Sequence, residues 1–127
     1  MILNLVDCAE RLAQALTSQM LPTVLCHSDL HAGNILVGSG GAFYIVDWDA
    51  PILAPKERDL MYIGGGQGFI NTTPQQEVDQ FFRGYGKTNV NEAAIAYYRY
   101  ERIVQDIAAF CEQLLLSEAG GSDREQS

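Results

Sequence analysis

A strand–turn–strand pattern at residues 35–46 constrains the fold more than any other part of the sequence. Two apolar runs, Ile-Leu-Val and Ala-Phe-Tyr-Ile-Val, flank the sequence Gly-Ser-Gly-Gly. Glycine and serine favour turns, so the pattern predicts a β-hairpin. Antiparallel pairing places the start of the first strand beside the end of the second. We therefore expect Asn34 and Asp47, which border the two strands, to lie close together.

The rest of the chain carries mainly helical patterns. Apolar residues recur at three- and four-residue steps over residues 3–19, and Pro22 follows that segment. A short helix is predicted at 56–63, because the glycine-rich run at 64–68 would end it. Another helix is predicted over 74–83, with a threonine cap and a proline at its start.

The longest helix is predicted to begin near Asn91. Its apolar residues step by three and four positions, as in a helix that packs on one face. We interpret this stripe as core; its members are Tyr97, Tyr100, Val104, Ile107, Cys111 and Leu114. The sequence thus predicts a mainly α fold with a small β-hairpin, an α+β arrangement in one domain over residues 1–116. The small and polar residues of 117–127 predict a disordered tail.

The composition is that of a globular protein without affinity for nucleic acid. The chain has 127 residues, of which 47% are apolar and 19% are charged. Its formal net charge is −8, so the basic surface that binds nucleic-acid phosphates is not expected. An acidic surface instead suits a cationic small molecule, which it would attract and concentrate.

The cysteines and the hydropathy pattern predict a cytoplasmic protein that does not enter membranes. Three widely spaced cysteines form no Cys-x-x-Cys pair, which is typical of buried thiols in a reducing compartment. Charged residues interrupt the first twenty positions, so no signal segment is predicted. No apolar run approaches the roughly 20 residues that span a bilayer.

Polar residues crowd the segment before the hairpin, His-Ser-Asp-Leu-His-Ala-Gly-Asn at 27–34. Phosphoryl transfer from a nucleotide requires a carboxylate that orients the attacking hydroxyl and oxygen ligands that hold magnesium. Asp29 can serve as that carboxylate and Asn34 as a neutral ligand, while the hairpin delivers Asp47 to the same metal. The order of loop, strand, turn, strand and aspartate matches a kinase catalytic loop followed by an aspartate of the DFG type.

A second interpretation makes the same loop a metal site of a hydrolase. In an extended chain, alternate residues face the same side. His27, Asp29 and His31 would then form a cluster that suits zinc or manganese. Asn34 would have no role in such a site. The glycine run at 64–68 lacks the strand and the lysine of a phosphate-binding loop, so we interpret it as a surface loop.

The segment Cys-His-Ser-Asp-Leu-His-Ala-Gly-Asn-Ile-Leu-Val, with Phe-Tyr-Ile-Val-Asp-Trp-Asp, resembles the catalytic core of the aminoglycoside phosphotransferase and choline kinase-like family. Residues 54–66 are similar to its spectinomycin phosphotransferase branch, and the resemblance spans residues 20–70. It implies the C-terminal helical lobe of a protein-kinase-like fold. It also implies transfer of phosphate, dependent on ATP and Mg²⁺, to a hydroxyl of an aminoglycoside or aminocyclitol, an activity of antibiotic resistance.

The resemblance implies roles for single residues. Asp29 matches the catalytic base, and Asn34 and Asp47 match the magnesium ligands. His27 matches a histidine that braces the loop. Asp59 matches an aspartate that hydrogen-bonds to the backbone of the catalytic loop.

Three residues near these keep open roles. Asp49 stands where protein kinases have the glycine of DFG, and it can assist a metal or a cationic substrate or cap the following turn. Trp48 can cover a bound nucleotide or pack in the core, and we favour packing. His31 has no assigned role.

Kinase-like enzymes hold ATP with a glycine-rich loop and a lysine on a smaller, strand-rich lobe. Here a single predicted helix precedes residue 20, and the only lysines are Lys56 and Lys87. We therefore expect the larger lobe alone, with weak ATP binding and little or no turnover. Its uncovered surface would favour a homo-oligomer or a separate chain that supplies the smaller lobe. The alternative function is a catalytically inactive remnant or interaction module.

Overall fold

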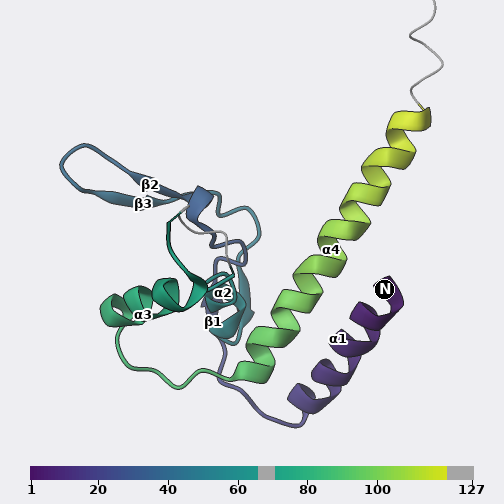
Figure 1. Ribbon diagram of the computed structural model, residues 1–127, viewed down its shortest axis with the longest axis horizontal. Helices are drawn as coiled ribbons and strands as arrows, with labels where there is room; N and C mark the ends of the chain where they lie inside the picture. The colour runs from purple at the N-terminus through teal and green to yellow at the C-terminus, as the bar shows by residue number, and fades with distance from the viewer. Residues whose placement is uncertain (66–70, 120–127) are drawn as a thin grey trace, which may run out of the picture.

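The computed structural model describes residues 1–65 and 71–119, with side chains described up to residue 116 (Figure 1). Within these ranges the chain forms four helices, four short strands and one 3-10 turn. In chain order the elements are α1 (Ile2–Thr17), β1 (Val24–Cys26), η1 (Ala32–Asn34), β2 (Ile35–Val37), β3 (Phe43–Ile45), β4 (Ile52–Ala54), α2 (Glu57–Leu60), α3 (Pro74–Tyr85) and α4 (Glu92–Ala119). The mainly α prediction is confirmed.

The predicted hairpin is present as β2 and β3. The two strands are antiparallel, with Ile35 opposite Ile45. Gly40 and Gly41 in the turn have φ values of +83° and +82°, a region that glycine enters without a steric penalty. The N–H of Val46 donates to the carbonyl of Asn34 at 3.0 Å, so the pairing continues one step beyond the strands. Asn34 is thereby placed beside the residue that precedes Asp47.

A second antiparallel pair, β1 with β4, was not predicted. Cys26 lies opposite Ile52, and Val24 lies opposite Ala54. Strand β4 is only three residues long and lies between two prolines, so it has no local periodicity that could identify it. Its position depends on a partner far away in the sequence. The pair matters for the site because β1 runs into the polar loop at 27–34 and β4 runs into α2.

The core lies where α2 meets the start of α4. Leu60, Met61 and Ile95 form a buried cluster, and four aromatic or aliphatic side chains pack around it: Tyr62, Phe81, Val90 and Tyr98. Two charged residues of α2 are also buried beside it. Glu57 accepts the N–H of Asn91 at 2.9 Å, and this contact joins α2 to the start of α4.

Helix α1 packs along the N-terminal half of α4 (Figure 1). The C-terminal half of α4 extends beyond α1, so the stripe predicted as core is only half confirmed. Its first members are half-buried, whereas Cys111 and Leu114 are exposed. The prediction of three buried thiols is wrong, because only Cys26 is buried: Cys111 lies on the part of α4 beyond α1, and Cys8 is half-buried on α1.

Two predicted segments fall partly outside the described residues. Helix α4 continues to Ala119, three residues past the predicted boundary at 116, and the remainder of the expected tail, 120–127, is not described. Residues 66–68 of the glycine-rich run also lie outside the described ranges. No helix within those ranges is long and apolar enough to cross a membrane.

Both two-stranded sheets expose apolar side chains. All six residues of β2 and β3 are exposed, from 39% for Ile35 to 72% for Phe43. In the other pair, Leu25 and Leu53 are 66% and 75% exposed. Contiguous apolar surface of this kind usually marks a place where another part of a protein binds.

The core cluster generates a stability prediction. Ile95→Ala should lower the free energy of unfolding by about 2–5 kcal/mol, because a buried isoleucine leaves a cavity when it is shortened. Urea unfolding followed by circular dichroism measures this change. Ile103→Ala is the matched control on the same helix, since Ile103 is 44% exposed, and it should cost much less. Equal losses from the two variants would show that the core does not lie at Ile95.

Candidate active site

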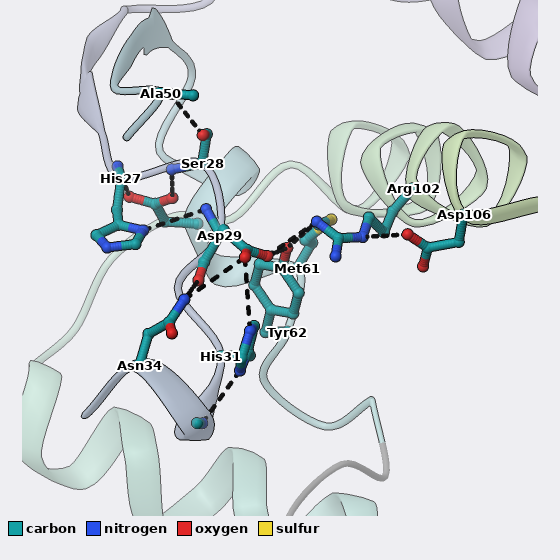
Figure 2. A network of polar contacts seen from close by, with 12 residues as sticks. His27, Ser28, Asp29, His31, Asn34, Ala50, Met61, Tyr62, Arg102 and Asp106 are labelled. Atoms are coloured by element: carbon teal, nitrogen blue, oxygen red, sulfur yellow. Dashed lines mark hydrogen bonds and ion pairs between the residues drawn. The ribbon is translucent and has the colours of Figure 1, made fainter. Parts of the chain in front are cut away.

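The Asp59 carboxylate fixes the start of the catalytic loop. Its Oδ2 accepts the N–H of His27 and its Oδ1 accepts the N–H of Ser28, both at 2.8 Å. Ser28 has a φ of 73°, a left-handed conformation that is unfavourable for a residue with a side chain. Its hydroxyl donates to the carbonyl of Ala50 at 2.7 Å (Figure 2). Asp59 thus makes the backbone contact that the resemblance implied.

His27 joins the loop to the end of the hairpin. The ring is buried, and its Nε2 lies 2.8 Å from the carbonyl oxygen of Val46. Its Nδ1 accepts the N–H of Asp29 at 3.3 Å. An accepting Nδ1 places the proton on Nε2, so Nε2–H donates to the carbonyl. Trp48 packs edge-on against the ring at 4.5 Å, but it is 48% exposed, so the expectation that it packs in the core is wrong. These contacts are those of a bracing histidine.

Asp29 is held at one oxygen by two donors (Figure 2). Its Oδ1 accepts the Tyr62 hydroxyl at 2.9 Å and the Arg102 Nη1 at 2.8 Å. The other oxygen, Oδ2, has longer contacts of 3.5 Å to the side chains of His31 and Asn34. The carboxylate is 34% exposed. Oδ1 therefore makes the two short hydrogen bonds, and Oδ2 makes only the two longer contacts.

The surroundings of Asp29 favour its ionised form. Partial burial alone would raise the pKa of this carboxyl. The hydrogen bond from Tyr62 and the positive charge of Arg102 outweigh that effect, and they hold the pKa below its ordinary value. The lowered pKa keeps Asp29 in its carboxylate form at neutral pH.

Asn34 turns its amide nitrogen toward Asp29. Nδ2 donates to the backbone carbonyl of Asp29 at 2.8 Å, and the residue is buried. This contact directs Oδ1, the oxygen that could bind a metal, away from the loop backbone. The 3-10 turn η1 positions the residue, because the N–H of Asn34 donates to the carbonyl of His31 at 3.0 Å.

Asp47 and Asp49 form an exposed acidic pair at the end of the hairpin. A hydrogen bond with Asp49 and repulsion from it raise the pKa of Asp47, and the charge of Asp29 adds to the effect. Asp47 has a φ of 66°, so the chain turns sharply there. Carboxylate and amide oxygens are the ligands that Mg²⁺ prefers, and a bound cation would relieve the repulsion. The donor set of Asn34, Asp47 and Asp49 therefore fits magnesium.

The geometry argues against the His-Asp-His cluster of a hydrolase. Both ring nitrogens of His27 are engaged by the backbone, so neither can bind a metal without breaking those contacts. His31 accepts the N–H of Gly33 through Nδ1. Within residues 1–65 and 71–119, no group of three or more His, Cys, Asp or Glu side chains is arranged to hold a metal ion.

Tyr62 and Arg102 contact the proposed base, and neither was predicted. Arg102 lies on α4, far from the loop in sequence, and no local pattern indicates which helix reaches Asp29. Tyr62 belongs to the segment 54–66 that carries part of the resemblance, so that segment contained a usable signal. Asn34 contacts Asp29 directly, and the N–H of Val46, the residue before Asp47, donates to the carbonyl of Asn34, so the hairpin brings the segments that carry the three predicted residues together.

The known proteins that this chain resembles are phosphotransferases. The profile of a family described as "Phosphotransferase enzyme family" matches residues 3–100. Two solved structures of spectinomycin phosphotransferase, APH(9)-Ia, are similar to the chain, each with 50% sequence identity and a TM-score of 0.74. One is a complex with ADP and spectinomycin, and the other is a complex with AMP. Comparison with curated protein sequences gives no match.

The alignments cover 90% of this chain but only 34% and 36% of those two chains. The chain thus spans about a third of the length of the structures that it matches. The family profile nevertheless covers most of the sequence. It includes every site residue described above except Arg102, which lies beyond residue 100 on α4. On this evidence the chain belongs to the phosphotransferase enzyme family.

Proposed function

We propose that the site transfers the γ-phosphate of ATP to a hydroxyl group of a cationic small molecule. The observation that carries the proposal is the convergence of three separate elements. The loop supplies Asp29, the 3-10 turn supplies Asn34, and the far end of the hairpin supplies Asp47. Their chemistry, one orienting carboxylate beside a set of oxygen ligands, is what phosphoryl transfer requires.

Asp29 acts on the acceptor hydroxyl. Its Oδ2 accepts the hydroxyl hydrogen bond and aims the oxygen at the γ-phosphorus. As the new O–P bond forms, the bond between the γ-phosphorus and the bridging oxygen breaks, and ADP leaves. The proton of the hydroxyl passes to Oδ2. Because the transition state of such transfers is loose, the proton can move late, and a carboxylate with a low pKa suffices.

The oxygens of Asn34 and Asp47 would hold magnesium, with Asp49 beside them. When bound, Mg²⁺ supplies positive charge that neutralises the phosphate oxygens. His27 and Asp59 do not touch the reacting groups in this scheme. They set the position of the loop through the backbone contacts described above.

An aminoglycoside or aminocyclitol is the acceptor class that we propose. One of the similar structures is a complex with spectinomycin, and its sequence is 50% identical to this chain. The net charge of −8 would attract a cationic acceptor. Antibiotic resistance is the biological role that such a reaction implies. A cytoplasmic location, suggested by the unpaired cysteines, would provide ATP.

ATP binding by these 127 residues alone should be weak. One of the two lysines, Lys56, pairs with the neighbouring Glu57 at 3.6 Å, and the other, Lys87, is exposed. The exposed strands β2 and β3 offer a surface on which a nucleotide-holding lobe, from a separate chain, or a second copy could pack. The same exposed surface favours the second candidate function, an inactive interaction module.

The proposed reaction predicts a loss of activity in Asp29→Asn. Transfer of labelled γ-phosphate from ATP to spectinomycin should be slow in the unsubstituted chain and should fall about 10²-fold or more in the variant, because the amide cannot accept the proton. Asp79→Asn, an exposed change on α3, should keep the unsubstituted rate. Equal rates in the two variants would contradict the role of Asp29. An absence of both transfer and ATP binding would favour the interaction module.

The proposed metal site predicts weaker Mn²⁺ binding in Asp47→Asn. Electron paramagnetic resonance, with Mn²⁺ as the probe for Mg²⁺, should show at least about a tenfold loss of affinity. Substitution of residues around a bound metal usually lowers metal affinity by about this factor or more. Binding to the unsubstituted chain should weaken as the pH falls through the raised pKa of Asp47, since protons then compete with the metal. Asp7→Asn on α1 is the control. Unchanged affinity in Asp47→Asn would exclude Asp47 as a ligand.

A further inference from the structure

We infer that Arg102, together with Tyr62, is a positioning residue that fixes Asp29 through Oδ1 and leaves Oδ2 as the oxygen that meets the acceptor hydroxyl. This inference rests on the proposed function and adds two residues to it. It assigns the two oxygens of one carboxylate different tasks. The grounds are the contacts of the two residues and the way in which α4 holds them.

The three side chains form a closed triangle. The Tyr62 hydroxyl donates to Asp29 Oδ1 at 2.9 Å, and Arg102 Nη1 lies 2.8 Å from the same oxygen. Arg102 Nη1 also donates to the Tyr62 hydroxyl at 3.2 Å. An oxygen with two strong donors is a poor acceptor for a third. A hydroxyl substrate is therefore directed to Oδ2, where the nearest side-chain donors stand at 3.5 Å.

Arg102 is itself fixed from the other side. Its Nε donates to Asp106 Oδ1 at 2.9 Å, one helical turn further along α4 (Figure 2). A guanidinium presents its donors in one rigid plane, so anchoring Nε determines where Nη1 points. The contact between Asp106 and Arg102 thus sets the direction in which Nη1 points toward Asp29.

Helix α4 positions Tyr62 as well. Arg99, three residues before Arg102, donates through Nε to the carbonyl of Met61 at 2.8 Å and through Nη2 to the carbonyl of Ile63 at 2.7 Å. These two carbonyls flank Tyr62 in the chain. One helix therefore holds both donors of Asp29, one directly and one through the backbone.

The first test reads the arrangement without catalysis. In ¹⁵N NMR spectra of the full chain, the Arg102 guanidinium should give separate Nη signals, because the contact of Nη1 with Asp29 hinders rotation about the Nε–Cζ bond. Asp29→Asn should average these signals, while Asp79→Asn should leave them separate. Averaged signals in the unsubstituted chain would overturn the inference, whether or not the chain transfers phosphate. An absence of transfer with separate signals would instead count against the proposed function.

The second test reads the positioning role in the reaction. Arg102→Met should lower kcat for phosphate transfer at least about tenfold with little change in the KM for ATP, because misplacing a reacting group costs rate rather than nucleotide affinity. Arg102→Lys should recover part of the loss. Arg83→Met, which removes an exposed arginine of α3, is the control for charge. If Arg102→Met folds poorly, Tyr62→Phe removes the other donor and should lower kcat in the same way. An unchanged kcat in both variants would overturn the inference.

Discussion

The site depends on the pair of hydrogen bonds from the N–H groups of His27 and Ser28 to Asp59. A left-handed conformation at a residue other than glycine costs about 1–3 kcal/mol, so Ser28 needs contacts that compensate. Hydrogen bonds to a carboxylate are about twice as strong as neutral ones, and Asp59 makes two of them. The resulting turn ends β1 and brings Asp29 to Tyr62 and Arg102. Without it, the loop could continue as an extended strand.

Asp59 can do this only because α2 is held in place from two directions. Strand β4 leads directly into α2 and pairs with β1, so the loop and its anchor share one small sheet. On the other side, Glu57 accepts the N–H of Asn91, and α2 thereby joins α4. Helix α4 then returns to the loop through Arg102. These contacts form a closed network, so displacement of one member should displace the others.

The parts of the site that could be predicted are those set by neighbours in the sequence. The hairpin, and with it the approach of Asn34 to Asp47, follows from two apolar runs and a glycine turn. The contact of Arg102 with Asp29 depends on how α4 crosses the loop, and no periodicity along the chain encodes that crossing. Strand β4 was missed for a similar reason, since its identity comes from β1. The buried stripe on α4 is shorter than predicted, because the periodicity of α4 cannot show where α1, the helix that covers it, ends.

The pKa values of Asp29 and Asp47 are shifted in opposite directions, and the difference follows from how far each carboxylate is buried. Asp29 is partly buried, where an unpaired charge would be costly, and it is matched with a guanidinium. Its contribution to stability is present at neutral pH and is lost as the pH falls through its lowered pKa. Asp47 lies beside Asp49 in water, where repulsion is weak enough to be tolerated, and its raised pKa means that ionisation lowers stability as the pH rises. An acidic chain can thus fold with its orienting carboxylate already paired, while the exposed pair keeps a charge that a cation can neutralise.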